Sequence, residues 1–200
     1  MAAVRRALAL VLLLLLLPIA LSAANTRLNL SRKFPVVEAE NRIWLGNPDG
    51  LLQYNPDDGS FRRFPLPVED RSPRIEQLRY ADEWLWCVLD RGLAALHVRL
   101  NEWLYFDAAS GLPDDVVNGL DFQDSHVWVA TPKGIARFDM LIEEWETFAE
   151  SRGKVEEILV EDENVWSIAA DGFAEYSPRF EKWRRFRLEG DSTARLNRAF

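Results

Sequence analysis

Two histidines, His97 and His126, have the side chains with the widest range of chemistry in this sequence. A metal site or a general base needs partner groups at fixed distances from such a residue. Neither histidine has a cysteine or a second histidine near it in the chain. We therefore expect both to be surface or strand-end residues without a role in metal binding or catalysis.

Paired carboxylates offer a second route to chemistry, because two facing carboxyl groups can cleave a glycosidic bond. The acidic pairs are Asp57-Asp58, Asp114-Asp115, Glu143-Glu144 and Glu156-Glu157. Each stands in a predicted turn or at a strand edge, where a solvated charge is the normal state. The acidic turn at residues 55–59 has too few oxygen ligands for calcium. Without a nucleophile elbow, phosphate loop or zinc signature, the sequence predicts no enzyme, no cofactor and no metal site.

Charge and cysteine content exclude further classes of protein. The chain has 24 Lys and Arg against 32 Asp and Glu, so it repels nucleic acid and we expect no nucleic-acid partner. Its one dense basic cluster, at residues 182–187, alternates with Trp183 and Phe186 and is typical of one face of a strand. Cys87 is the only cysteine and follows Trp86 in an apolar run. We expect it to be a small buried hydrophobic residue outside any intrachain disulfide.

The N-terminus predicts export. Arg5 and Arg6 precede an unbroken apolar run at residues 7–17, and small residues follow up to Ala24. This order is that of a secretory signal peptide spanning residues 1–24, with residues 25–32 as a linker. An uncleaved membrane anchor is the alternative, although the apolar run is short for a hydrocarbon core of about 30 Å. The expected location is the periplasm or the outside of the cell.

The elements that would position any site come from an internal repeat. Trp44, Trp86, Trp128 and Trp166 are separated by 42, 42 and 38 residues, and a glycine follows each of them six residues later. Four further apolar positions keep the same register. The shorter interval lies between the third and fourth units, which places the length change in a connecting loop.

Each unit divides into four short strands, predicted in the third unit at residues 116–122, 126–130, 135–138 and 144–148. Glycine after Asp or Lys between them fits a hairpin turn with positive φ. Four strands in about 40 residues form a blade of a β-propeller, an all-β fold. We predict four antiparallel blades at about 33–69, 70–110, 111–151 and 152–187, followed by a tail or the start of a further blade at 188–200. The recurring Trp and Phe rings should fill the spaces between neighbouring blades.

The third unit carries the most specific motifs: Gly111-Leu112-Pro113-Asp114-Asp115, Trp128-Val129-Ala130-Thr131 and Gly134-Ile135-Ala136-Arg137-Phe138-Asp139. They closely resemble the repeat of two-component-regulator propellers, and the resemblance spans residues 36–186. It implies a periplasmic or extracellular sensor propeller. Fuller members place a membrane span and a histidine kinase after the blades, and many detect carbohydrates. The second and fourth units depart from the motif because they lack its Gly-Thr pair, and we expect no signalling output to be encoded within these 200 residues.

Four blades leave ring closure open, because propellers have four to eight. The chain could be part of a longer product, close as a four-bladed ring, or join a second chain in an eight-bladed ring. Any binding face should lie at the channel mouth, where the loops between second and third strands meet those between blades. The candidate binding residues there are Asn47, Asp49, Asp90, Arg91, Asp114, Asp115, Thr131, Lys133 and Asp171.

Three functions remain after these steps. The first is a ligand- or partner-binding sensor in signal transduction, with an unknown ligand for which carbohydrate is one candidate. The second is a structural module that completes a ring as a homo-oligomer or binds another envelope protein. The third, and least favoured, is a propeller hydrolase or lyase, which would need convergent carboxylates or a bound metal.

Overall fold

The computed structural model of this chain describes residues 34–47, 50–68, 73–148, 154–188 and 196–199. The predicted signal peptide and linker, and the candidate residue Asp49, lie outside the described residues. The described part consists of β-strands and their connections.

Each repeat unit folds into one antiparallel sheet whose strands follow chain order. Sheet 1 holds β1 (Val36–Ala39), β2 (Arg42–Asn47), β3 (Gly50–Tyr54) and β4 (Phe61–Phe64). Sheet 2 holds β5 (Ile75–Ala81), β6 (Trp84–Leu89), β7 (Leu93–His97) and β8 (Glu102–Phe106). Sheet 3 holds β9 (Gly119–Gln123), β10 (His126–Thr131), β11 (Gly134–Asp139) and β12 (Glu144–Phe148). Sheet 4 holds β13 (Glu157–Glu161), β14 (Asn164–Ala169), β15 (Gly172–Ser177), β16 (Lys182–Leu188) and β17 (Leu196–Ala199).

The predicted four-stranded units are confirmed, and the main local differences lie at β9 and in the C-terminal tail. β9 begins at Gly119, three residues later than expected, because Asp114 Oδ1 accepts the amide of Val116 at 3.0 Å and keeps the chain in a turn. The tail adds β17, which pairs with β16 from Leu188↔Leu196 to Arg185↔Ala199 as a fifth strand of sheet 4.

The turns repeat as strictly as the strands. The glycines that open the third strands have positive φ, for example 85° at Gly92 and 135° at Gly134, as the hairpin chemistry predicts. Left-handed residues also recur between first and second strands, at Glu40, Asp82, Asp124 and Asp162. The same holds between third and fourth strands, at Gly59, Asn101, Glu143 and Glu181. Both series keep the spacing of the tryptophans.

Three apolar cores hold consecutive sheets together. Trp44 lies in the core between sheets 1 and 2, Trp86 in that between sheets 2 and 3, and Trp128 in that between sheets 3 and 4. All three side chains are 0% exposed. The expectation that the repeated tryptophans fill the spaces between blades is therefore confirmed for these three. Trp166 is only half-buried, because no described sheet packs on its side of sheet 4.

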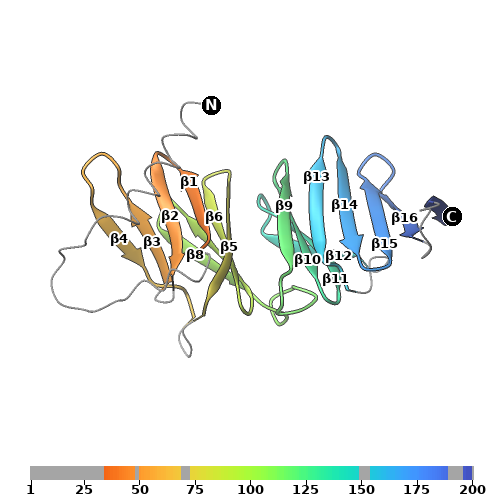
Figure 1. Cartoon of the computed structure of the whole chain (residues 1–200), viewed down its shortest axis with the longest axis horizontal. Coiled ribbons are helices and arrows are strands. Elements are labelled where there is room, and N and C mark those ends of the chain that lie inside the picture. Colours follow the sequence, from red (N-terminus) through yellow and green to blue (C-terminus); the bar gives the residue numbers. More distant parts are fainter. Residues whose placement is uncertain (1–33, 48–49, 69–72, 149–153, 189–195, 200) are drawn as a thin grey trace.

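The four sheets form an open row (Figure 1). β4 of sheet 1 lies at one end of the long axis and β16 of sheet 4 at the other. The chain thus has the sheets of a propeller, and the described sheets do not close into a ring.

Candidate functional site

The loops that were expected to form a channel mouth do meet between sheets 2 and 3. Arg91, in the β6–β7 turn, donates from Nη2 to Asp115 Oδ2 at 2.7 Å. The amide of Gly92 donates to the carbonyl of Asp115 at 2.6 Å. Asp115 belongs to the connection between β8 and β9, so this contact joins two loops of different sheets.

The neighbouring carboxylate, Asp114, binds a cation from the other side. Lys133 Nζ, in the β10–β11 turn, lies 3.1 Å from Asp114 Oδ2. The pair Asp114-Asp115 therefore links a turn of sheet 2 to a turn of sheet 3. Hydrogen bonds from the amides of Val116 and Ala108 are the main reason that the pKa values of Asp114 and Asp115 lie below their usual range, and Lys133 and Arg91 lower them further.

Three other predicted residues have structural contacts within their own sheets. The Thr131 side chain is fully buried, and its hydroxyl donates to the Gly134 carbonyl at 2.8 Å. Asp90 Oδ1 accepts the amide of Arg74 at 3.3 Å. Asn47 ends β2 and pairs with Gly50 across the hairpin. Asp171 is the predicted residue that lies apart from these contacts, at the end of sheet 4.

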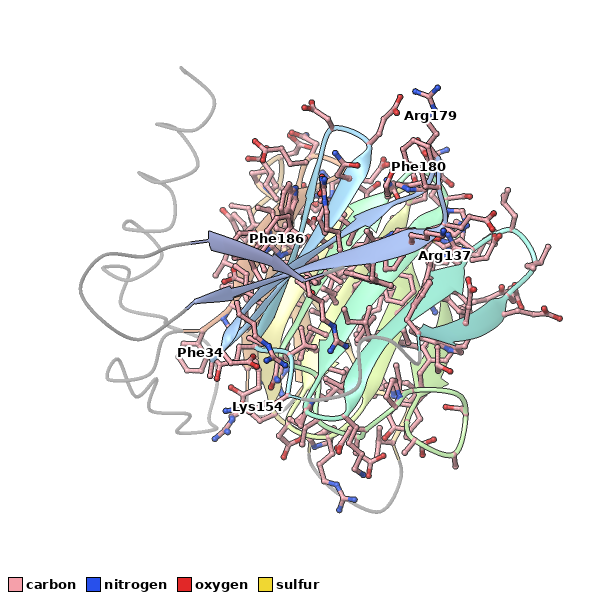
Figure 2. The ribbon with its side chains drawn as sticks, turned by 90° about the vertical axis from the view of Figure 1, so that its right-hand side faces the viewer. Phe34, Arg137, Lys154, Arg179, Phe180 and Phe186 are labelled. Carbon is pink, nitrogen blue, oxygen red and sulfur yellow. The ribbon has the colours of Figure 1, made fainter. Side chains whose placement is uncertain are left out.

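Asp171 lines a pocket of about 290 Å³ on the side of sheet 4 that faces sheet 3. Its floor includes Ser167, and Trp183 forms an aromatic wall. Three basic side chains surround this apolar part: Lys154, Arg185 and Arg187. In Figure 2 Lys154 lies at the lower edge of the end of the molecule that faces the viewer.

The pocket lies where an inter-sheet connection fills the space in the earlier units. Between sheets 2 and 3, Leu112 is 4% exposed and belongs to the same core as Trp145, the counterpart of Trp183. Between sheets 1 and 2, Leu66 and Val68 pack against the core in the same way. The connection from sheet 3 to sheet 4 is four residues shorter. Its described part supplies Lys154 and Val155 to the pocket.

The charges of the pocket oppose those of the whole protein. Lys154 Nζ lies 3.2 Å from Glu156 Oε1, which neutralises one of its three cations. Arg185 and Arg187 have no ion-pair partner among the described residues. The lining thus has three cations and one carboxylate, that of Asp171, on a protein with a net charge of −8. Guanidinium groups bind carboxylate, sulfate and phosphate through parallel hydrogen bonds.

The remaining reactive residues lie elsewhere. His97 Nε2 is 3.8 Å from Glu83, and His126 Nε2 is 3.4 Å from Asp139, each at the end of a strand as predicted. Cys87 is fully buried, as expected, and burial raises the pKa of its thiol. No cluster of three potential metal ligands occurs among the described residues. In the same part of the chain, no helix is long and apolar enough to cross a membrane.

Sequence reasoning missed the basic side of the pocket. The sequence pattern predicts that the basic residues at 182–187 share one face of a strand. In the structure they alternate: Arg185 and Arg187 lie on the pocket side of β16, and Lys182 and Arg184 lie on the opposite side. The available signal was the shortened interval before the fourth unit, which sets this connection apart from the two earlier ones.

No protein-family model matches the chain, and no curated protein sequence matches it. Solved structures with the same arrangement of sheets do exist. One is the extracellular domain of the putative one component system BT4673 from B. thetaiotaomicron, at 18% identity and a TM-score of 0.62. The match covers 88% of this chain and 28% of that one, so this chain spans about a quarter of its length.

Two computationally designed proteins share the fold as well. The match to Ika8 has 17% identity and a TM-score of 0.61, and it covers 84% of this chain and 52% of Ika8. The match to Ika4 has 15% identity and a TM-score of 0.59, and it covers 78% of this chain and 95% of Ika4. The WD40 domain of Neurospora crassa Pan2 also matches, with 10% identity and a TM-score of 0.57, over 87% of this chain and 63% of that one. WD40 domains are β-propellers, so this likeness confirms the predicted fold class.

Proposed function

We propose that this chain is an exported, sensor-like propeller that binds a small anionic ligand in the pocket on sheet 4. The observation that carries the proposal is the set of three basic side chains, Lys154, Arg185 and Arg187, around one aromatic-walled pocket. We propose a role in binding and not in catalysis. A ligand with a carboxylate or sulfate group, such as an acidic saccharide, suits this chemistry, since Trp183 offers a ring beside the cations.

Local charge supports an anionic ligand. A basic pocket on an acidic protein concentrates anions at that place, whereas the rest of the surface repels them. The volume of about 290 Å³ is near the lower limit for small-molecule sites, so a group of monosaccharide size is a suitable probe. The position is specific to the fourth unit, because Leu66 and Leu112 occupy the corresponding spaces in earlier units.

The likeness to extracellular domains supports a sensor-like role at the level of the fold. BT4673 is described as a one component or hybrid two component system, and its extracellular domain carries sheets stacked in the same way. The N-terminal sequence, which predicts export, agrees with such a location.

Calorimetric titration of the purified chain with glucuronate and with glucose tests the proposal. We expect glucuronate to bind and glucose not to bind. Arg185→Gln and Arg187→Gln should each weaken glucuronate binding by at least about tenfold, because a charge-assisted hydrogen bond contributes about 1.5–3 kcal/mol.

The matched control is Lys182→Gln, which removes the same charge from the same strand on the opposite side of the sheet. It should leave the affinity for glucuronate unchanged. An equal loss in Lys182→Gln would reveal non-specific charge attraction. Absence of binding by glucuronate, sulfate and phosphate alike would refute an anion site in this pocket.

A further inference from the structure

The three internal contacts between sheets follow one pattern. We use "Trp face" for the face of a sheet that bears the repeated tryptophan and "receiving face" for the opposite one. Between sheets 3 and 4, the core contains Trp128, Ala130 and Ile135 from the Trp face of sheet 3. It also contains Ile158, Val165 and Tyr176 from the receiving face of sheet 4. Sheets 1 and 2, and sheets 2 and 3, meet in the same orientation.

The Trp face of sheet 4 repeats this arrangement with nothing packed on it in the described part of the chain. Trp166, Phe173 and Phe186 form a row of rings, with centroids 5.9 Å apart for the first two and 4.8 Å for the last two. Beside them Leu159 is 47% and Ile168 40% exposed. Figure 2 views the molecule from this end and labels Phe186 on the sheet nearest the viewer. An exposed apolar face of this kind marks an interaction surface.

One ion pair lies in the middle of this face, and the other charged residues, Glu157, Glu161 and Lys182, are exposed. Glu175 forms an ion pair with Arg184, and it is 8% exposed. The two residues lie on the third and fourth strands, at the places that Arg137 and Glu146 occupy in sheet 3. The Arg137–Glu146 pair, at 2.6 Å, lies beside the core between sheets 3 and 4, since Arg137 stacks over Trp128 at 5.3 Å. An Arg–Glu pair at this place is therefore compatible with a packed sheet.

The opposite end of the row carries the complementary surface. On the receiving face of sheet 1, Val36 is 42% and Phe61 50% exposed. Phe61 packs against Tyr54 at 4.9 Å, in the place where Trp183 packs against Tyr176 at 5.2 Å in sheet 4. A Trp face packs on a receiving face at each of the three contacts between consecutive sheets. The row therefore ends with an uncovered receiving face on sheet 1 and an uncovered Trp face on sheet 4 in the described part of the chain.

We infer that a second copy of this chain covers both ends. The Trp face of sheet 4 in each copy would pack on the receiving face of sheet 1 in the other, giving a closed ring of eight sheets with twofold symmetry. Sheet 1 and sheet 4 of one chain lie at opposite ends of the row (Figure 1). Two copies give eight blades, the upper value usual for propellers, whereas three copies would exceed it.

The matches to the two designed proteins agree with a four-sheet unit that occurs in two ways. The shared fold covers 95% of the Ika4 chain and 52% of the Ika8 chain. A unit of this size therefore occurs both as nearly a whole chain and as about half of one.

Light scattering of the purified full chain after gel filtration tests the inference. We expect twice the mass of one chain. Ile168→Asp on one face and Phe61→Asp on the other should each give a single-chain mass, because a buried charge cannot be accommodated in an apolar contact. Both positions are exposed in the single chain, so the variants should fold, which circular dichroism verifies. Phe180→Asp and Leu141→Asp, at turn residues 66% and 79% exposed, are controls that should keep the double mass.

Mixing the two single-face variants separates this arrangement from a contact between identical faces. The Ile168→Asp chain retains a normal receiving face, and the Phe61→Asp chain retains a normal Trp face. The mixture should therefore form a one-to-one complex although each variant alone does not. A single-chain mass for the unmodified protein at all concentrations, or a double mass that survives both variants, would overturn the inference.

Discussion

Asp114 and Asp115 show how two adjacent residues of one loop hold two sheets in register. Each accepts an amide of its own loop and pairs with a cation of a different sheet. The composition of the loop predicted a solvated acidic turn, and the structure adds that both charges have partners. Sequence patterns could not pair Arg91 with Asp115, because the two residues are 24 positions apart and meet only through the stacking of sheets.

Because of Asp115 and its ion pair with Arg91, the free energy of unfolding should depend on pH in the acidic range. The amide of Ala108, and after it Arg91, hold the pKa of the Asp115 carboxyl below its usual value, so the folded state binds fewer protons than the unfolded chain. The contribution is complete above the unfolded pKa and is lost as the pH falls through the folded pKa, which means below about pH 4. Urea unfolding from pH 7 to pH 3 should show a smaller acid-induced loss in Asp115→Asn than in the unmodified chain.

The partner residue supplies the check on this prediction. Arg91→Gln should reduce the acid-induced loss in the same direction, and the double variant should add little to either single change. The Arg91 side chain is largely exposed and that of Asp115 partly so, which means that the effect should be small and should shrink further in high salt. An acid profile that is identical in all three variants and the unmodified chain would contradict a stabilising pair.

The thiol of Cys87 should be inert in the folded protein. It is fully buried between sheets 1 and 2, and burial raises its pKa, so little thiolate forms. A colorimetric thiol reagent should detect no cysteine in the native chain and one per chain in denaturant. Leu141→Cys, at a position 79% exposed, should add one thiol that reacts at once. Rapid native labelling of the unmodified chain would mean that this core opens readily.

At the scale of elements, the connections between sheets differ more than the sheets do. Spacing and turn chemistry in the sequence were sufficient to place the strands, because each hairpin is a local structure with its own φ signature. The packing of the Gly111-Leu112 segment could not be predicted from spacing and turn chemistry. Its function in packing depends on Trp145, a residue of the following fourth strand, and on the space between two sheets.

Gly111→Ala should destabilise the protein by about 1–3 kcal/mol. The glycine has φ +122°, and an added Cβ would lie 2.8 Å from Trp145 Cδ1. Gly59→Ala is the matched control, since Gly59 has φ +72° and no atom within 4 Å of the added Cβ. Thermal unfolding should therefore show a smaller loss in Gly59→Ala. Equal losses would mean that backbone conformation, and not contact with Trp145, limits residue 111.

At the scale of the whole molecule, the repeat predicted four stacked sheets but not how the row ends. Every repeat unit has a tryptophan at the same place, and this pattern alone predicts that all four side chains are equally buried. The structure distinguishes Trp166 from the other three, because burial of a repeated residue depends on the presence of a next sheet. Likewise, the sequence shows that the connection between sheets 3 and 4 is shorter, but the pocket beside sheet 4 can be recognised only once the sheets are stacked.

Each apolar core in this protein joins two consecutive sheets, and each uses the same positions of the repeat. A gene segment encoding one unit could therefore be duplicated or deleted by unequal recombination. The sheets on either side of the change would still pack through the same positions of the repeat. Blade number can drift in such a lineage without a new core having to evolve. Loops between blades, which carry the distinctive charges, are then free to diverge copy by copy.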